Sequence, residues 1–592
     1  MNIKYYQNKI NDNSQTLESL KNKIRPMPIL KLFFFAAATF FIVSPFVWGW
    51  IKLPNFLISG TMWIVFFILH YKDVKYCNQR DAILAINQVY SNEIGYFNND
   101  FSALYNGKRF IDNSHEYSFD LDVFGEKSLF HRLNRTVSYE ANSILAEKLK
   151  TIPNNTDEVI ERQKALQELA KKDNFRHYFL AICNGFGRQK SDYNRLKNHQ
   201  STALTGNLSL TLMIISISLT FTLILLSALN IVPWSFPALF FVLQMFAPMF
   251  LFRKINKASR EVGWLHKNFK QYAQLIQLIQ EQDFESEENK SLKNKLLFPL
   301  NALDAFKQLS SILEKFDQRN NSYALIVLNG LFLRDFFLLR TYNKWCLAYK
   351  NHIQQWVLDL AEMESRISLA TFVFNHPDYV SPEVTDNQDI LIKTTNVGHP
   401  FISADKLVGN DFTIHKNKFS IITGANMSGK STFLRTIGVN YILALNGVKV
   451  CAEKFQFSLF HLFSSMRNAD DLTLGISYFN AELIRIKQLI QFVKSKNHTL
   501  IILDEILKGT NSKDKLAGSI IFLKEMEKLP TTGIIATHDL ELSNLENEKP
   551  EIYENYCFEI NLAETIDYSY KIEKGISKNL NATYLLKKIL EN

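Results

Sequence analysis

Long stretches without charge mark the N-terminal part of the chain. No Lys, Arg, Asp or Glu occurs between Lys31 and Lys52, or between Lys52 and Lys72. A helix needs about 20 apolar residues to cross a bilayer. The first stretch is long enough, and the second is plausible as the return leg of a hairpin. A signal peptide would be shorter and would not be followed by a second span. We therefore predict a transmembrane hairpin over residues 28–71, after a polar tail at residues 1–27.

A second uncharged stretch is the stronger membrane signal. No charged side chain occurs between His199 and Arg253, and the turn-forming segment NIVPWSFP, residues 230–237, divides the stretch into two apolar halves. A buried helical pair in a soluble core is the alternative interpretation, but soluble domains rarely keep so long a stretch uncharged. The pattern predicts a second transmembrane hairpin over residues 205–252, which makes four transmembrane helices in all.

Basic residues flank both predicted hairpins on the side of the large segments. The two hairpin tips carry only Lys52, whereas Lys and Arg cluster before and after each hairpin. Positive residues favour the cytoplasmic side of a membrane. We therefore expect a multi-pass protein of the inner membrane, with both termini and all large segments in the cytoplasm.

A phosphate-binding pattern lies in the C-terminal part of the chain. TGANMSGKST, residues 423–432, fits G-x-x-x-x-G-K-[ST], and it lies between an apolar segment and a segment with helical spacing. In a strand–loop–helix context, backbone N–H groups and the helix N-terminus converge on phosphate oxygens, and the lysine reaches the β- and γ-phosphates. The predicted nucleotide-binding residues are Gly424, Ala425, Asn426, Met427, Ser428, Gly429, Lys430, Ser431 and Thr432.

Two later apolar segments end in polar residues that suit the same site. HTLIILDE, residues 498–505, predicts a central parallel strand whose carboxyl end carries Asp504 and Glu505, at the edge where such sheets bind ligands. We expect Ser431 and Asp504 to hold Mg²⁺, and Glu505 to orient or deprotonate the attacking water. TGIIATHD leads to His538, which is either a sensor of the γ-phosphate or a polar strand end. Its position at the same edge favours the sensor.

Four segments together resemble the ATPase domain of MutS-type mismatch-repair proteins, within the ABC-type ATPase superfamily. They are GANMSGKSTFLRTIG, DDLTLGISYFNAEL, LDEILKGTNSKD and ATHDLEL, in the order and spacing of the family. The resemblance implies an α/β ABC-type P-loop ATPase domain over residues 396–592 that hydrolyses ATP with Mg²⁺. It also implies that Ser477 contacts the γ-phosphate bound by a partner subunit, so that a homodimer encloses the nucleotide.

Upstream segments resemble the α-helical core of MutS proteins more weakly. SLFHRLNRTVSYEANSILAEKLK and WVLDLAEMESRISLATF are similar to its opening and closing helices. This implies that the first part of the core and a lever helix occupy residues 72–204, and that a lever helix and the second part occupy residues 253–395. The second hairpin would then replace the DNA-touching clamp of the family. No segment resembles the mismatch-reading N-terminal domain, so we expect a member that lacks it.

Composition narrows the function to two hypotheses. The hydrophobic content of 47% excludes a disordered chain, five scattered cysteines suit a reducing compartment, and no motif for zinc or haem occurs. A net charge of +9 suits DNA or an anionic membrane surface. One hypothesis is a membrane-anchored MutS-like ATPase, coupled to DNA binding in mismatch repair or DNA damage. The other is an ATP-driven membrane transducer or assembly factor without DNA. The basic residues 187–200 suit either partner, and their place beside a predicted span favours lipid.

Overall fold

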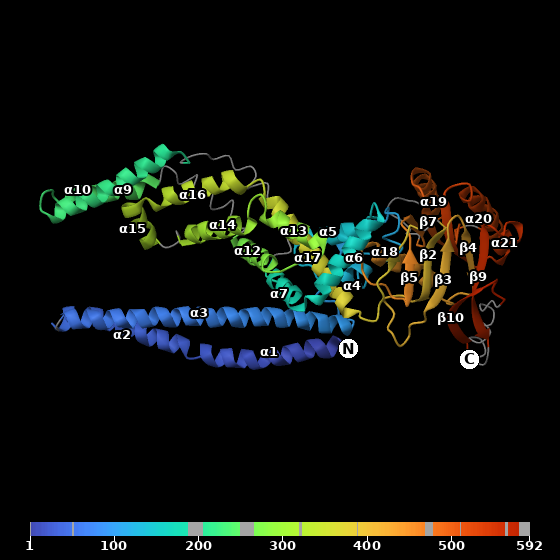
Figure 1. The fold of residues 1–592 in the computed structure, drawn as a ribbon, viewed down its shortest axis with the longest axis horizontal. Coiled ribbons are helices and arrows are strands. Elements are labelled where there is room, and N and C mark those ends of the chain that lie inside the picture. The colour runs from blue at the N-terminus through green and yellow to red at the C-terminus, as the bar shows by residue number, and fades with distance from the viewer. Residues whose placement is uncertain are drawn as a thin grey trace. The chain divides into compact units, whose positions relative to one another are not determined.

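The computed structural model of this chain describes residues 2–49, 52–186, 205–248, 266–318, 322–386, 389–467, 478–509, 511–562 and 566–578. These residues form two compact units (Figure 1). Unit 1 comprises residues 1–104 and 174–186, and unit 2 comprises residues 105–173 and 187–592.

Unit 1 is built from long helices. Helix α3 packs along both α1 and α2, and an ion pair of 2.6 Å between Lys31 and Asp73 joins α2 to α3. Pro26 starts α2, and Gly49 ends it with a φ of 69°, a backbone conformation that glycine favours. The helices are α1 (Asn2–Ile24), α2 (Met27–Trp48), α3 (Lys52–Phe97) and α7 (Asp173–Cys183), whose first residue belongs to unit 2.

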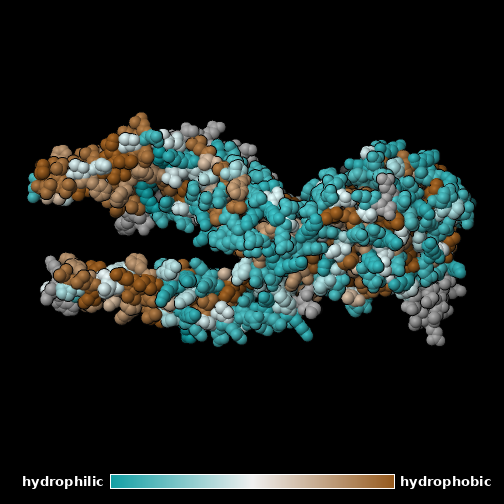
Figure 2. Space-filling model, in the orientation of Figure 1, coloured by the Kyte–Doolittle hydropathy of each residue, from teal (hydrophilic) through white to brown (hydrophobic). Residues whose placement is uncertain are grey.

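Three described helical stretches are long and apolar enough to cross a membrane. They are Ile3–Trp48, Leu53–Phe97 and Asn207–Ala228, and only 17%, 11% and 11% of their most apolar parts are buried. Figure 2 shows hydrophobic surface gathered over α2, over the adjoining part of α3, and over a second apolar region that includes α9 (Asn207–Ala228) and α10. The predicted fourth span corresponds to α10 (Ser235–Phe246), which is shorter than a span, and its predicted end at residues 249–252 lies outside the described residues. The prediction of four spans therefore stays a prediction.

The second apolar region in unit 2 contains polar contacts between its helices. The side-chain amide of Gln244 donates to the backbone carbonyl oxygen of Ser216 at 3.1 Å and to the Ser216 hydroxyl at 2.7 Å, and the Thr220 hydroxyl donates to Oε1 of Gln244 at 3.0 Å. A third apolar helix packs on α10, where Gly330 leaves room for Phe241. The helices are α9 (Asn207–Ala228), α10 and α15 (Ser322–Phe332).

The other helices of unit 2 that precede the α/β region form a packed group around α17, which is buried along most of its length and contacts α5, α6, α12 and α13. The buried Glu364 carboxylate accepts from the backbone N–H groups of Val137 and Ser138, and from the Ser138 hydroxyl at 2.6 Å. Ser138 and Asn155 cap the N-termini of α5 and α6. The helices are η1 (Lys108–Phe110), α4 (Leu129–Leu133), α5 (Tyr139–Lys150), α6 (Thr156–Lys171), α12 (His266–Gln280), α13 (Glu287–Leu297), α14 (Ala302–Asp317), α16 (Arg334–Tyr349) and α17 (Ile353–Asn375).

The C-terminal part of unit 2 is an α/β region with two sheets among its described residues. One sheet has the strand order β1-β5-β2-β3 and the other has the order β10-β9-β4-β8-β7-β6. In the larger sheet, strands β9, β4, β8, β7 and β6 run parallel and β10 is antiparallel to β9. The strands are β1 (Glu383–Val384), β2 (Ile390–Val397), β3 (Asn410–His415), β4 (Phe419–Gly424), β5 (Lys454–Phe457), β6 (His461–Ser465), β7 (Thr499–Asp504), β8 (Thr531–Thr537), β9 (Tyr553–Leu562) and β10 (Ile566–Lys574).

The parallel strands explain where a site can form. Strands β4 and β8 are buried along their whole length, as is typical of parallel sheets covered by helices. Side chains from the sheet, α19 and α20 form one apolar core, which includes Ile421, Ile501 and Ile535. The carboxyl ends of β4, β8 and β7 meet at one edge because these strands are neighbours in the sheet. The helices are α18 (Lys430–Leu445), α19 (Tyr478–Ser495), α20 (Ser512–Met526), η4 (Leu540–Ser543) and α21 (Asn544–Glu548).

Candidate active site

The predicted strand–loop–helix is present: β4 ends at Gly424 and α18 begins at Lys430. The connecting loop uses backbone conformations that favour glycine, with φ of 150° at Gly424 and 109° at Gly429. A Cβ on Gly424 would lie 2.8 Å from the carbonyl oxygen of Phe558. The sequence therefore allows a tight loop that places the free N–H groups of the first turn of α18 beside the sheet edge.

Lys430 is buried within this loop. Its ammonium group donates to the carbonyl oxygens of Gly424 at 2.8 Å and Ala425 at 2.9 Å. Burial lowers the pKa of Lys430 to about 8, although the negative charges of Asp504 and Glu505 act in the opposite direction. The protein thus holds a poorly solvated cation at the edge of the sheet, and such a group gains from contact with an anion.

Ser431 and Asp504 lie together, although they come from different elements. The hydroxyl of Ser431 on α18 donates to a carboxylate oxygen of Asp504 at the end of β7, at 2.6 Å. Hydroxyl and carboxylate oxygens are ligands that Mg²⁺ accepts in proteins. The structure therefore brings the two predicted metal ligands side by side.

Glu505 and His538 form a second polar group at the same edge. His538 Nε2 lies 3.1 Å from Glu505 Oε1, and Lys515 lies 3.4 Å from the other oxygen of Glu505. The backbone of Glu505 has a φ of 59°. Burial and the nearby Lys430 lower the pKa of His538, while Glu505 acts in the opposite direction. His538 Nδ1 lies 2.9 Å from the Gly424 carbonyl oxygen, so the histidine connects the loop to the carboxylate.

These side chains line a cavity of about 680 Å³, a volume typical of small-molecule sites. The lining residues from the phosphate loop and the carboxyl edge of the sheet are Asn426, Met427, Ser428, Gly429, Lys430, Ser431, Thr432, Asp504, Glu505, Lys508 and His538. Gly424 and Ala425 instead contribute the carbonyl oxygens that contact Lys430. The predicted site residues Gly424 to Thr432, Asp504, Glu505 and His538 are thus brought together, whereas Ser477 lies outside the described residues.

The cavity is also lined by residues that the sequence patterns did not indicate as site residues. Most of them are apolar or aromatic side chains that suit a planar ring, and His399, Lys406, Asn410 and Thr436 are the polar ones. Phe433 and Thr436 lie on α18 after the phosphate loop, whereas the other residues come from β2, β3, β9, β10 and the loops beside them. The residues are Val397, His399, Ile402, Lys406, Val408, Asn410, Phe433, Thr436, Phe558 and Tyr570.

The fold and the site together define an α/β domain with a phosphate-loop motif at the carboxyl edge of a parallel sheet. Residues 420–585 match the family described as MutS domain V. The chain is 32% identical over 238 residues to the DNA mismatch repair protein MutS of Acetivibrio thermocellus, which covers 39% of this chain and 27% of the relative. It is 33% identical over 216 residues to MutS protein homolog 4 of Homo sapiens, which covers 34% of this chain and 22% of the relative.

Through this C-terminal domain, the chain is a member of the MutS family. It spans about a quarter of the length of the curated relatives that it matches. The similarity also extends to the DNA mismatch repair protein MutS of Geobacillus sp. (strain WCH70), at 30% identity over 234 residues.

Proposed function

We propose that this protein is a MutS-type ATPase that binds ATP with Mg²⁺ in the cavity and hydrolyses it. One observation carries the proposal: Lys430 and Ser431 from the start of α18 face the same cavity as Asp504 and Glu505 from the end of β7, and Ser431 is hydrogen-bonded to Asp504. An ATPase needs a cation for the phosphates, oxygen ligands for the metal and a base for the water. The family similarity supports the same activity.

The residues of the cavity fit a nucleoside triphosphate with Mg²⁺. The Ser428 hydroxyl lines the cavity and is buried without a hydrogen-bond partner among the described residues, so a phosphate oxygen would satisfy it. The described residues contain no cluster of three or more His, Cys, Asp or Glu side chains that could hold a metal ion. The Ser431 and Asp504 pair still suits Mg²⁺, because this ion takes few protein ligands and completes its shell with water and phosphate.

Separate residues of the chain would hold the metal ion, bind the phosphates and accept the proton. Bound Mg²⁺ would neutralise charge on the phosphate oxygens, held by Ser431 and Asp504. Lys430 gives up its hydrogen bonds to the carbonyl oxygens of Gly424 and Ala425 and donates to phosphate oxygens instead. Glu505 accepts the proton of the water that attacks the γ-phosphorus, while the bond between that phosphorus and the bridging oxygen breaks and ADP leaves. His538 holds Glu505 toward the cavity.

The working unit that we propose is a homodimer. Ser477 of one copy would contact the γ-phosphate bound by Lys430 of the other, as the family resemblance implies. A helix N-terminus presents free N–H groups to an anion, and Ser477 directly precedes α19 in the sequence. ATP binding would then close the two copies and hydrolysis would reopen them.

We also propose that the protein is anchored in the inner membrane through residues 28–71 and 205–252, with the ATPase domain and both termini in the cytoplasm. Exposed apolar helices and the basic residues that flank them support this orientation. The lipid bilayer is then one partner. DNA is the second, because two of the relatives are named for DNA mismatch repair. The proposed role is ATP-dependent DNA binding in mismatch repair or DNA damage.

A second candidate function follows from the packing of α9, α10 and α15, which form a helical group and not two isolated anchors. An ATP-driven membrane transducer or assembly factor would use this group without binding DNA.

Retention of the detergent-solubilised full-length protein on duplex DNA separates the two functions. It should be measured with ATP, with ADP and without nucleotide, at about 50 and 200 mM salt. DNA coupling predicts retention that depends on nucleotide and weakens steeply at the higher salt, because phosphate contacts release counterions. No retention, or equal retention at both salt concentrations, would favour the transducer. ATP turnover by the same sample tests the enzymatic part of the proposal.

A further inference from the structure

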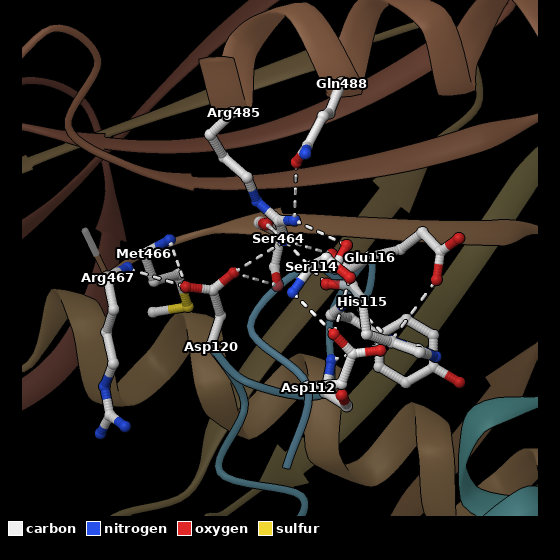
Figure 3. Close-up of polar contacts among 12 residues, drawn as sticks. Asp112, Ser114, His115, Glu116, Asp120, Ser464, Met466, Arg467, Arg485 and Gln488 are labelled. Atoms are coloured by element: carbon white, nitrogen blue, oxygen red, sulfur yellow. Dashed lines mark hydrogen bonds and ion pairs between the residues drawn. The ribbon is translucent and has the colours of Figure 1, made fainter. Parts of the chain in front are cut away.

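A buried aspartate from outside the α/β region reaches the end of β6 and the side of α19 (Figure 3). Asp120 is 2% exposed. One carboxylate oxygen accepts from the backbone N–H groups of Met466 and Arg467, at 3.0 and 2.8 Å. The other accepts from the hydroxyl of Ser464 at 3.1 Å and from the guanidinium of Arg485 at 3.3 Å. Asp120 therefore joins β6 to α19 through a single side chain.

Arg485 has little freedom to move away from this contact. Its guanidinium also donates to the carbonyl oxygens of His115 at 3.0 Å, Glu116 at 2.9 Å and Ser464 at 2.8 Å. It lies over the ring of Phe463, 4.4 Å from the ring centre. Charge-assisted hydrogen bonds from a buried planar group fix its orientation, so Arg485 anchors α19 against the segment that carries Asp120.

The same helix contacts the predicted catalytic loop through Glu482, one turn before Arg485. Glu482 is 3% exposed, and its carboxylate accepts from the backbone N–H of Lys508 at 3.1 Å. Lys508 lines the cavity and lies three residues after Glu505. Within this loop, Glu505 and Leu507 have φ of 59° and 62°. This left-handed region of backbone conformation costs free energy for residues other than glycine. A loop in this conformation needs external contacts to keep it.

A second aspartate of the same segment extends the contact to the helix that follows the phosphate loop. The Asp122 carboxylate pairs with both terminal nitrogens of Arg467, at 2.5 and 2.7 Å, and lies 3.8 Å from Arg435 on α18. Its backbone carbonyl oxygen accepts from the N–H of Leu129, where α4 begins. The segment is thus bonded to the helical group on one side and to the α/β region on the other.

We propose that Asp120 is a positioning residue for the ATP site. It fixes α19 through Arg485, and α19 holds the loop that carries Glu505 through the contact of Glu482 with Lys508. This inference rests on the proposed ATPase function and adds to it a residue that precedes the first strand of the α/β region by about 260 positions in the sequence. A shift of the helical group would thereby change the placement of the base while leaving the phosphate loop intact.

The test is Asp120→Asn in the full-length, detergent-solubilised protein. The amide keeps the size of the side chain and removes the charge that faces Arg485. We expect kcat to fall about tenfold or more, because small displacements of a catalytic group have large effects on rate. The dissociation constant for a fluorescent ATP analogue should stay within about threefold of the wild-type value. Asp120 does not line the cavity, so the substitution removes no contact with bound ATP.

Two further variants separate positioning from general stability. Asp112→Asn is the matched control, because Asp112 lies on the same segment and its carboxylate accepts from the backbone N–H and the hydroxyl of Ser114, at 2.9 and 2.6 Å, within its own loop; its kcat should equal that of the wild type. Glu482→Met removes the acceptor for the backbone N–H of Lys508 and should reproduce the kcat defect from the other side of α19. The double variant with Asp120→Asn should lose less than the product of the two single effects, because both act through one helix.

Three outcomes overturn the inference. The first is a folded Asp120→Asn protein with wild-type kcat. The second is a loss of kcat, ATP affinity and thermal stability together. If Asp120→Asn does not fold, Glu482→Met decides alone, and a wild-type kcat in that variant is the third. Wild-type protein that does not hydrolyse ATP would overturn the proposed function and this inference with it. Wild-type turnover that Lys430→Ala abolishes and Asp120→Asn leaves unchanged would overturn only the inference.

Discussion

Ser431 donates a 2.6 Å hydrogen bond to Asp504, although the two residues are 73 positions apart in the chain. The contact exists because β4 and β7 both pair with β8 in parallel register. Their carboxyl ends therefore meet, and the first turn of α18 lies beside the acidic end of β7. The proposed metal site depends on this sheet order, since neither residue could hold Mg²⁺ together with the other in a different strand arrangement.

Lys430→Ala should weaken ATP binding by about 100-fold or more, because a charge-assisted contact with phosphate is lost. The measurement is equilibrium binding of a fluorescent ATP analogue to the solubilised protein. Lys528→Ala is a matched control, since Lys528 is exposed and its ion pair with Glu525 lies within one turn of the same surface segment. Unchanged affinity in the Lys430 variant would remove this loop from the nucleotide site.

Glu505→Gln should keep ATP binding but lower kcat by about 10²–10⁴-fold, the usual contribution of a general base. The amide keeps the shape of the side chain and cannot accept the proton. We expect ATP to trap the closed dimer of this variant, which size-exclusion chromatography with ATP and with ADP would detect. Normal turnover would show that another group accepts the proton.

Ser477→Ala and Lys430→Ala should complement one another when the two inactive proteins are mixed and allowed to exchange subunits. If one site takes Lys430 from one copy and Ser477 from the other, each mixed dimer regains one intact site. Statistical exchange within a two-fold dimer then restores about a quarter of wild-type turnover.

The control for complementation is a mixture of Lys430→Ala with Glu505→Gln. These two residues line the cavity of the same copy, so every site in a mixed dimer lacks one of them and turnover stays low. Recovery in both mixtures, or in neither, would contradict a site shared in this way.

Acid should destabilise unit 2 below about pH 6.5 through His399. This side chain is 8% exposed, and burial, followed by the charges of Arg435 and Arg132, lowers its pKa to about 4. The unfolded chain keeps a histidine pKa of about 6.5. The unfolded state therefore binds a proton first, and stability present above pH 6.5 is lost as the pH falls toward 4. Between pH 6.5 and 5 the loss is about 2 kcal/mol.

The comparison that checks this effect is the denaturation midpoint of wild-type protein and of His399→Gln at pH 7.5 and 5. The glutamine carbonyl can still accept from the backbone N–H of Phe401, as His399 does at 3.2 Å. The variant should lose less stability between the two pH values than the wild type. An equal loss in both proteins would assign the acid sensitivity to other groups.

The phosphate loop and the acidic end of β7 could be predicted from the sequence because each lies within one short, continuous segment. The loop from Gly424 to Ser431 and the acidic end of β7 each combine a short apolar strand with a polar motif, so the order of residues alone specifies strand, turn and chemistry. Membership of the MutS family followed from the same motifs, and the match over residues 420–585 confirms it.

The long-range part could not be predicted in this way. Asp120 and Arg485 are 365 positions apart, and DLDVF and AELIRI contain no pattern that pairs them. Tyr570 reaches the cavity only because β10 folds back beside β9. The length of α10 was also not evident, because hydropathy reports an uncharged stretch and not the point at which a helix ends.

The bonds between Gln244 and the helix α9 have a mechanical consequence within the proposed bilayer. The hydrocarbon interior of a bilayer contains no water that could replace these hydrogen bonds, so breaking them would leave the polar groups of Ser216, Thr220 and Gln244 without partners. Rotating or sliding α9 relative to α10 would carry that cost in free energy. A rotation of α9 is therefore resisted by its bonds to Gln244 on α10, and the two helices move together.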